Sequence, residues 1–263
     1  MTQTTVSLRS VALPTEHGGW SLTLEPVALG LIVEPGWAGA ALGLVALLGF
    51  LGRTPVKLVL VDRQRGRSLE RTRLASRVAV VELALAGLLL AVAWATAEAA
   101  FWWPLAAAVP LIGLELWYDM RSRSRRLVPE LAGSVGVSSM AAAIALAGGG
   151  ATAVAVGLWA VAGARAVAAI PFVRLQLRRL KGQPHNRLTS DLAQGAAVAV
   201  VVVAALLESA PGAAVVVVGL MAIAHMTLAY LPAPPVAMVG AEQVVIGLTV
   251  VLATGLGALA QFS

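Results

Sequence analysis

Nearly all the positive charge of this 263-residue chain lies in three short clusters, and each cluster separates two long apolar segments. The clusters occupy residues 53–77, 121–126 and 174–187 and hold seventeen of the nineteen Lys and Arg residues; the exceptions are Arg9 and Arg165. Basic loops beside apolar segments stay on the cytoplasmic side of a membrane. The pattern therefore predicts a polytopic membrane protein with its three clusters on one side.

The composition also indicates a membrane protein. Hydrophobic residues make up 59% of the chain and charged residues 12%, whereas a soluble domain carries about 25% charged residues. The chain has no cysteine, which excludes disulfides, thiolate catalysis and Cys-ligated metals. The net charge of +6 flanks apolar segments, so we expect membrane lipids, including anionic lipids, as partners and no nucleic acid.

Apolar runs of about 20 residues are long enough to cross a bilayer, and nine such runs predict one all-α domain, a transmembrane helical bundle over residues 1–263. The predicted spans cover residues 18–33, 37–61, 76–96, 101–117, 127–147, 152–177, 192–207, 212–231 and 236–260. With the amino terminus inside, the connections after spans two, four and six face the cytoplasm and carry the basic clusters. The connections after spans one, three, five and seven then face outward and contain neither Lys nor Arg.

Five of the predicted spans carry an ionisable residue near the same end. These residues are Glu25, Glu82, Glu115, His225 and Glu242. Each lies within about eight residues, or roughly 12 Å, of the cytoplasmic end of its span. Because ionisable residues inside a membrane are costly and mark functional sites, their shared depth predicts a polar cavity open to the cytoplasm. Arg165 lies in mid-span and needs a partner, for which Glu25 and Glu115 are the candidates.

The first span begins with a polar line. His17, Ser21 and Glu25 are four residues apart and share one helix face. The adjacent glycines at positions 18 and 19 leave room for a backbone or ligand to approach. This arrangement favours a functional site over a helix entry with a solvated histidine.

Three further spans carry charged pairs spaced one helical turn apart. The pairs are Arg53 with Lys57, Glu115 with Asp119, and Arg174 with Arg178. Guanidinium groups bind phosphate and carboxylate through paired hydrogen bonds. We therefore expect the four cations to hold an anionic, phosphate-bearing and lipidic ligand. The groups expected to orient that ligand or to move protons are His17, Glu25, Glu115 and Asp119.

Several enzyme classes lack their sequence motifs here. The chain contains no HExxH or paired-His spacing, no GxSxG, no Walker A sequence and no GxGxxG. Hydrolase and nucleotide-driven pump activities are therefore excluded. The scattered His residues give no prediction of a metal site.

Residues 14–20 (PTEHGGW), 25–26 (EP) and 52–57 (GRTPVK) resemble the YwiC-like family of bacterial integral membrane proteins. The segment 171–178, with Asn186 and Asp191 after it, is similar to a second polar block of that family. The resemblance covers most of the chain. It implies a multi-pass protein of the bacterial inner membrane and adds Asn186 and Asp191 to the candidate ligand-binding residues, but it implies no activity.

A more distant resemblance is to UbiA-type prenyltransferases, which are nine-helix bundles with a polar cavity near the cytoplasmic side. Their two Asp-rich motifs follow the second and sixth helices, the connections in which Asp62 and Asp191 lie here. Residues 62–67 (DRQRGR) and 70–73 (ERTR) are similar to the tail of the first motif. The resemblance implies a UbiA-like fold and places Asp62 and Asp191 at the ligand site.

The chain departs from these Asp-rich motifs at most of their positions. Leu58, Val59 and Gly66 stand where the first motif has polar residues, and Arg174 and Arg178 occupy the end of the helix that carries the second. Two Mg²⁺ ions need several carboxylates each, and one Asp in each connection cannot supply them. We therefore expect no cofactor and direct binding of the anion by Arg.

Three functions remain open from the sequence. The first is binding of an anionic lipid, with or without catalysis, by a degenerate prenyltransferase-like protein; convergence of Asp62, Asp119 and Asp191 would indicate a metal-dependent transferase. The second is a small-anion transporter or permease, which requires a polar path outward past Arg165. The third is a non-catalytic membrane accessory factor, whose cavity would be filled by side chains.

Overall fold

The structure is a computed structural model that describes residues 8–12, 17–121 and 126–262. The described residues form the five-residue helix α1 (Leu8–Ala12), nine helices of 17–29 residues, and no strand. The nine are α2 (His17–Val33), α3 (Trp37–Gln64), α4 (Glu70–Thr96), α5 (Trp102–Met120), α6 (Leu127–Ala147), α7 (Thr152–Leu180), α8 (Leu188–Leu206), α9 (Gly212–Leu228) and α10 (Val236–Phe262). One helix corresponds to each predicted span, so the all-α prediction is confirmed.

Six of these helices are long and apolar enough to cross a membrane, namely α3, α4, α6, α7, α8 and α10. Helices α2 and α9 are apolar but shorter, and the 19-residue α5 carries Glu115 and Asp119 in its second half. The chain is therefore a multi-pass membrane protein. Helices α3, α4 and α7 extend beyond the predicted spans at their basic ends, because helical hydrogen bonding continues where the membrane stops.

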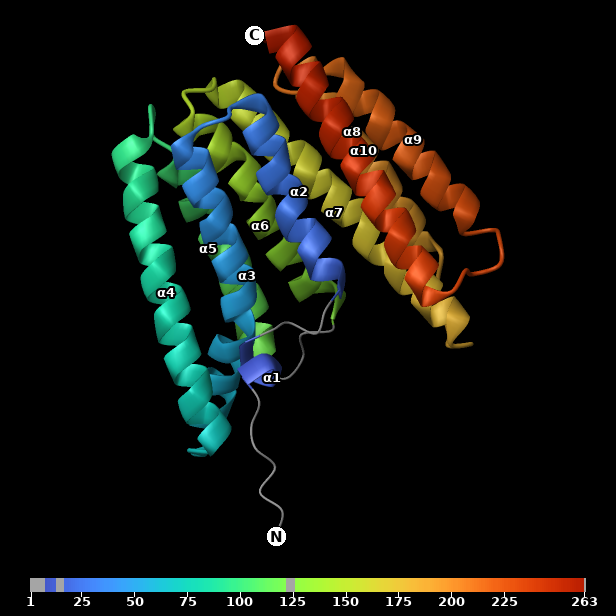
Figure 1. Ribbon diagram of the computed structural model, residues 1–263. Coiled ribbons are helices and arrows are strands. Elements are labelled where there is room, and N and C mark those ends of the chain that lie inside the picture. The colour runs from blue at the N-terminus through green and yellow to red at the C-terminus, as the bar shows by residue number, and fades with distance from the viewer. Residues whose placement is uncertain (1–7, 13–16, 122–125, 263) are drawn as a thin grey trace.

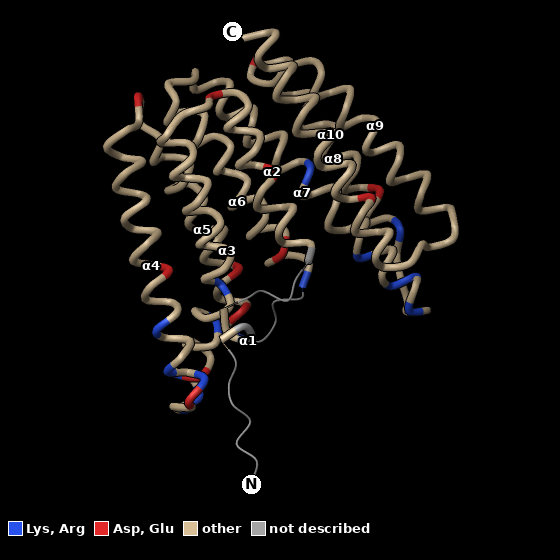
Figure 2. Tube along the Cα trace, viewed as in Figure 1, with Lys and Arg blue, Asp and Glu red and all other residues tan. Residues whose placement is uncertain are grey.

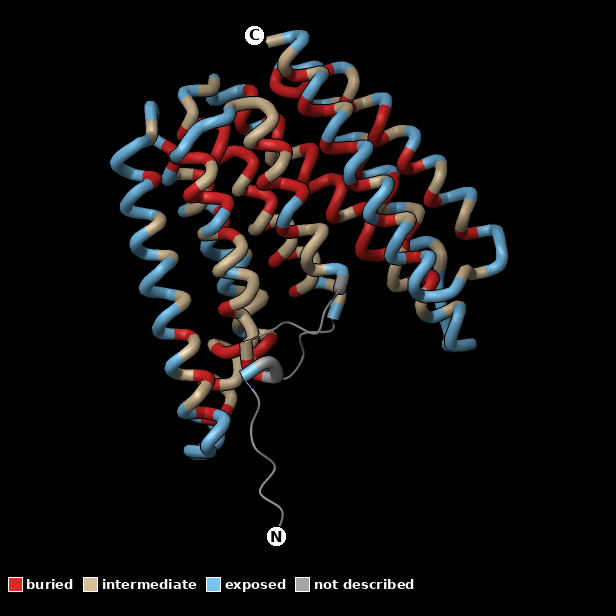
Figure 3. Tube along the Cα trace, viewed as in Figure 1, coloured by how far each residue is buried: buried red, intermediate tan, exposed pale blue. Residues whose placement is uncertain are grey.

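The bundle has three parts (Figure 1). Helices α3, α4 and α5 lie on one side, α8, α9 and α10 lie on the other, and α2, α6 and α7 lie between them. Buried residues concentrate along α6 and α7, whereas α4 is exposed over most of its length (Figure 3). Apolar side chains that are exposed on α4, such as Leu83 and Leu88, are suited to contact lipid.

Small residues let the central helices approach closely. A Cβ atom added to Gly30 of α2 would lie 2.8 Å from the Cβ of Ile144 in α6, and one added to Gly255 of α10 would lie 2.6 Å from Cγ2 of Ile32. Membrane helices pack through small residues because lipid gives little hydrophobic drive for their association. The glycines thus bring α2 against both α6 and α10.

Charge is separated between the two ends of the bundle (Figure 2). Apart from Arg165, the Lys and Arg residues of the described helices gather at the end where α3 and α7 finish and α4 and α8 begin. We call this the basic end. The side of the membrane that it faces remains the sequence prediction.

The connections at the opposite end carry acids and no described Lys or Arg. Glu34 follows α2 and Glu98 follows α4, and both contact the glycines at positions 148–150 after α6. Burial and then the neighbouring carboxylate of Glu98 raise the pKa of Glu34.

Candidate functional site

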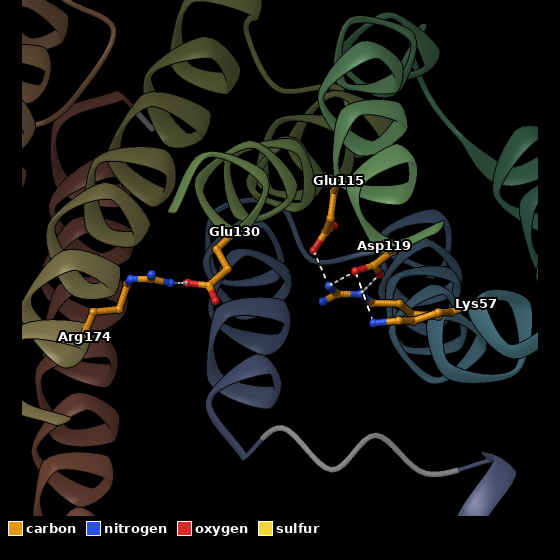
Figure 4. A network of polar contacts seen from close by, with 6 residues as sticks. Lys57, Glu115, Asp119, Glu130 and Arg174 are labelled. Carbon is orange, nitrogen blue, oxygen red and sulfur yellow. Dashed lines mark hydrogen bonds and ion pairs between the residues drawn. The ribbon is translucent and has the colours of Figure 1, made fainter. Parts of the chain in front are cut away.

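The first polar site lies between α3 and α5 near the basic end. Arg53 Nη2 lies 2.8 Å from Glu115 Oε1, and Arg53 Nε donates to Asp119 Oδ2 at 3.1 Å. Lys57 Nζ donates to Asp119 Oδ1 at 3.3 Å. Figure 4 shows Lys57, Glu115 and Asp119 pointing toward one another. We call these four residues the α3–α5 cluster.

The α3–α5 cluster combines two cations with two carboxylates. The Asp119 side chain is 1% exposed, whereas those of Arg53 and Lys57 are 28% and 33% exposed. A buried carboxylate is costly unless it is paired and hydrogen-bonded, and both cations supply such contacts to Asp119. Conversely, Asp119 holds the two cationic side chains side by side at the edge of the bundle.

The close packing of α5 on α6 positions Glu115. Its carboxylate lies directly over Gly133 of α6, where a Cβ atom would overlap both carboxylate oxygens. On the other side of α3, Glu82 of α4 lies near Gly52, at 3.4 Å from the position of an added Cβ atom. Within the described part of the chain, Glu82 Oε2 is buried without a hydrogen-bond partner.

A second polar site crosses the centre of the bundle, where Arg165 of α7 is 2% exposed. Its Nη2 lies 3.4 Å from Glu25 Oε1 of α2 and donates to the carbonyl oxygen of Gln243 in α10 at 2.7 Å. Its Nη1 donates to Gln243 Oε1 at 3.1 Å. The hydroxyl of Ser21 donates to Glu25. Of the two candidate partners of Arg165, the structure therefore assigns Glu25.

The same network continues into α9 and α8. Gln243 Nε2 lies 3.0 Å from His225 Nε2, and His225 Nδ1 lies 3.2 Å from Gln194 Oε1. Gln194 Nε2 donates to the carbonyl of Ala168 at 2.9 Å, and Phe172 stacks on the His225 ring. An amide donor at Nε2 and an amide oxygen at Nδ1 match a neutral imidazole protonated at Nδ1. We call the residues Ser21, Glu25, Arg165, Gln243, His225 and Gln194 the buried polar chain.

Little space remains beside the buried polar chain. A Cβ atom at Gly247 of α10 would overlap the Glu25 carboxylate and lie 3.0 Å from Arg165 Nη2. An adjoining cavity of about 10 Å³ is lined by Glu25, Arg165 and apolar neighbours. A volume of roughly 10–15 Å³ accommodates one water molecule, so this site has no room for a larger ligand.

The end of α7 forms a third polar site. Arg174 Nη1 lies 2.7 Å from Glu130 Oε2 of α6, and this pair appears in Figure 4 beside the α3–α5 cluster. Their side chains are 26% and 31% exposed, respectively. Arg178, one turn further along α7, is exposed.

The remaining predicted ligand residues stabilise local structure. Asn186 Oδ1 accepts a hydrogen bond from the backbone N–H of Leu188 at 2.8 Å, at the start of α8. Asp191 Oδ2 lies 3.5 Å from Arg187 Nε, and the Arg187 guanidinium lies over the ring of Tyr230. These contacts fix the connection between α7 and α8.

Asp62 lies where α3 meets α4. It is 1% exposed and accepts hydrogen bonds from Thr72 Oγ1 at 2.6 Å and from Arg71 Nη2 at 3.1 Å. It therefore joins the end of α3 to the start of α4. The carboxylates of Asp62, Asp119 and Asp191 pair with different partners, and no group of three His, Asp or Glu among the described residues is placed to hold a metal.

The amino-terminal half of the chain contains the α3–α5 cluster, Asp62 and Glu25, and this half identifies the family. The family model for YwiC-like protein matches residues 13–145, just over half of the chain. The chain belongs to the YwiC-like family. No curated protein and no solved structure matches it. In this YwiC-like protein, the matched segment includes the whole α3–α5 cluster, whereas Arg165, His225 and Gln243 lie outside it.

The structure of this YwiC-like protein divides the five ionisable residues of similar depth between separate sites. Glu115 belongs to the α3–α5 cluster, and Glu25 and His225 belong to the buried polar chain. Glu242 Oε2, like Glu82 Oε2, is buried without a described partner. The sequence predicted one polar cavity, but Glu115, Glu25 and His225 lie in two separate sites and contact other polar side chains there. His17 begins α2, but its side chain lies outside the described part.

Two residues of the buried polar chain were missed from the sequence. Gln243 connects Arg165 with His225, and Gln194 connects His225 with the backbone of Ala168. The sequence reasoning considered only ionisable groups within the spans. Both residues could have been found in the sequence as amide side chains within otherwise apolar runs, because an amide group inside a membrane also needs hydrogen-bond partners.

Proposed function

We propose that this YwiC-like protein binds an anionic, phosphate-bearing lipid at its basic end, from the cytoplasmic leaflet of the bacterial cell membrane. The observation that carries the proposal is the pairing of Arg53 and Lys57, which Asp119 holds side by side and partly exposed. Arg174 and Arg178 provide a second pair of cations at the same end.

The charge of the basic end supports an anionic partner. Basic residues near a membrane surface attract anionic lipid by about 1 kcal/mol each. A guanidinium group adds directional hydrogen bonds to a phosphate. In the α3–α5 cluster the carboxylates hold both cations in place before the lipid arrives, which lowers the cost of ordering them on binding.

The same contacts favour direct anion binding over a metal bridge. Asp119 accepts from Arg53 and Lys57, and Asp62 accepts from Arg71 and Thr72. Metal binding there would require these carboxylates to exchange their present partners. In this proposal the protein shares the helical bundle and the class of ligand with UbiA-type prenyltransferases. Its carboxylates differ in role, because they position cationic side chains and not metal ions.

Anion transport would require a different interior. Between Arg165 and the opposite end, α7 contributes apolar residues such as Leu158 and Val161, which pack in apolar clusters. Ile144 of α6 is buried in the same region. These side chains provide no polar path, so the geometry favours a site that opens to one side.

The test is lipid retention in nanodiscs of phosphatidylcholine and phosphatidylglycerol, measured by native mass spectrometry, with polyprenyl phosphate as a second probe. The double variant Arg53→Gln/Glu115→Gln removes one charge of each sign, so the net charge of the α3–α5 cluster stays at zero. We expect it to lose at least about tenfold in anionic-lipid retention, because a charge-assisted hydrogen bond contributes about 1.5–3 kcal/mol. Arg73→Gln, an exposed change on α4, is the control. Equal retention in wild type, variant and control would refute the proposal.

A further inference from the structure

An apolar groove runs beside α7 within the membrane-spanning part of the bundle. Its volume is about 320 Å³, within the range of roughly 300–1,000 Å³ of small-molecule pockets. Residues from three helices form it, including Val135 of α6, Trp159, Gly163 and Val167 of α7, and Ala197 and Val200 of α8. All three helices have the length and composition of membrane spans.

The lining of the groove suits a hydrocarbon chain. The indole N–H of Trp159 donates to the carbonyl of Val135 at 2.9 Å, so the polar atom of the tryptophan is already paired. Gly163 has no side chain to fill the groove, and a Cβ atom added there would be in van der Waals contact with Val135, at 3.8 Å. A polar ligand would lose its hydrogen bonds on entry, whereas an apolar chain would lose nothing.

The register of α7 connects the groove to the basic end. Gly163, Val167, Arg174 and Arg178 are separated by four, seven and four residues, so they share one helix face. At 1.5 Å per residue, Arg174 lies about 10 Å and Arg178 about 16 Å along the axis from Val167. Glu130, which pairs with Arg174, precedes the groove residue Val135 by five positions on α6. The Arg174–Glu130 pair therefore lies toward the basic end of the groove.

The dimensions fit one lipid in one leaflet. From Arg174 to Trp159 the helix rises about 22 Å, which is close to half the thickness of roughly 40–45 Å that a bilayer has with its headgroup regions. A phosphate at Arg174 and Arg178 would place a chain of leaflet length alongside the groove. Arg178 is exposed, and its positive charge favours a lipid with an anionic headgroup over a neutral lipid.

We propose that the groove between α6, α7 and α8 holds one acyl chain of an anionic phospholipid whose phosphate contacts Arg174 and Arg178. This inference rests on the proposed function and names the path of the lipid chain. It assigns the headgroup of this lipid to the α7 cations, a second binding position at the basic end in addition to the α3–α5 cluster.

The test uses phosphatidylglycerol with brominated acyl chains, which quench tryptophan fluorescence on contact, in nanodiscs at the same mole fraction as brominated phosphatidylcholine. We expect brominated phosphatidylglycerol to quench more strongly than brominated phosphatidylcholine, and we call this difference the excess quenching. The excess quenching should be lost in Trp159→Phe. Gly163→Leu fills the groove and should abolish the excess. Gly195→Leu adds the same side chain to an exposed position of α8 with no atom within 4 Å, and it should keep the excess.

Headgroup selection is tested by Arg178→Gln, which should reduce the excess quenching, against Arg73→Gln, which should not. Val167→Phe is a second filling variant in case Gly163→Leu disturbs packing, and circular dichroism checks folding of each protein. Equal quenching by the two brominated lipids, or an excess unchanged by both filling variants, would overturn the inference.

The outcomes separate this inference from the proposed function. If anionic-lipid retention depends on Arg53 while the excess quenching ignores Gly163→Leu and Val167→Phe, the lipid binds at the α3–α5 cluster and its chain lies outside the groove. If the filling variants abolish quenching but Arg178→Gln has no effect, the groove holds chains without selecting the headgroup, and the inference fails.

Discussion

The stability of the buried polar chain depends on the charge of Glu25. In Glu25→Gln, Arg165 keeps its hydrogen bonds to the two Gln243 oxygens at 2.7 and 3.1 Å but loses its counter-charge. Removing one partner of a buried ion pair costs about 3–5 kcal/mol, and an arginine at the centre of a membrane helix costs about 2.5–3.5 kcal/mol. Because the Gln243 oxygens remain, we expect a loss of about 3 kcal/mol, or roughly a hundredfold in the folding equilibrium.

Two further proteins distinguish charge pairing from a simple loss of contacts. Ser21→Ala removes a hydroxyl that donates to Glu25 but keeps both charges, so we expect a loss of about 1 kcal/mol or less. The double variant Glu25→Gln/Arg165→Met removes both charges. It gives up the two hydrogen bonds from the Arg165 guanidinium to Gln243, for which about 0.6 kcal/mol each is the average in a membrane protein, but it leaves no uncompensated charge and should be more stable than Glu25→Gln.

The assay is reversible unfolding by dodecyl sulfate in mixed micelles, followed by helical circular dichroism at neutral pH. The decisive comparison is the double variant against Glu25→Gln. If the double variant is the less stable of the two, the changes act independently, and the reasoning that Glu25 compensates the charge of Arg165 is wrong.

Three other positions give stability predictions for unfolding by dodecyl sulfate, at neutral pH for Gly157 and Thr72 and over a pH series for Glu34. Gly157→Ala would place a methyl group on the backbone carbonyl of Ser209, so we expect a loss of about 1–3 kcal/mol; unchanged stability would contradict the close approach of α7 to the α8–α9 connection. Thr72→Val removes the hydroxyl that donates to buried Asp62 and should cost about 1.5–3 kcal/mol without changing lipid retention. Burial raises the pKa of Glu34, so its stabilising effect should be complete below about pH 4 and lost as the pH rises through the raised value. Glu34→Gln should remove that dependence.

The sequence was sufficient for the nine long helices of the described residues and for the breaks between them, whereas the short helix α1 was not predicted. Long apolar runs need helical hydrogen bonding to cross a membrane, and breakers such as the Pro-Gly pair at positions 35–36 act locally. Helix α3 accordingly begins at Trp37, directly after that pair. The need of Arg165 for an acidic partner also followed from local chemistry, because a charge in mid-span must be compensated.

The grouping of the polar residues did not follow from the sequence. Position along a helix gives depth, but the direction in which a residue faces depends on which helices are neighbours. Glu25 and Glu115 were both candidate partners of Arg165, yet α2 packs on α7 and α10, whereas Glu115 faces Arg53 of α3. Glycines at the close contacts, such as Gly247, could not be assigned to a partner without the packing.

The balance of charge within the bundle determines how lipid binding should respond to salt. Arg53 and Lys57 already pair with two carboxylates, and salt screens such partly buried pairs much less than exposed charges. Arg178 is exposed at the end of α7, where the Debye length falls from about 30 Å at 0.01 M salt to about 3 Å at 1 M. Anionic lipid held mainly by α7 should therefore dissociate as salt rises, and lipid held mainly by the α3–α5 cluster should remain. A salt titration of phosphatidylglycerol retention in wild type, Arg178→Gln and Arg53→Gln/Glu115→Gln would identify the site that dominates. A salt dependence in Arg178→Gln that equals that of the wild type would contradict the assignment of the headgroup to α7.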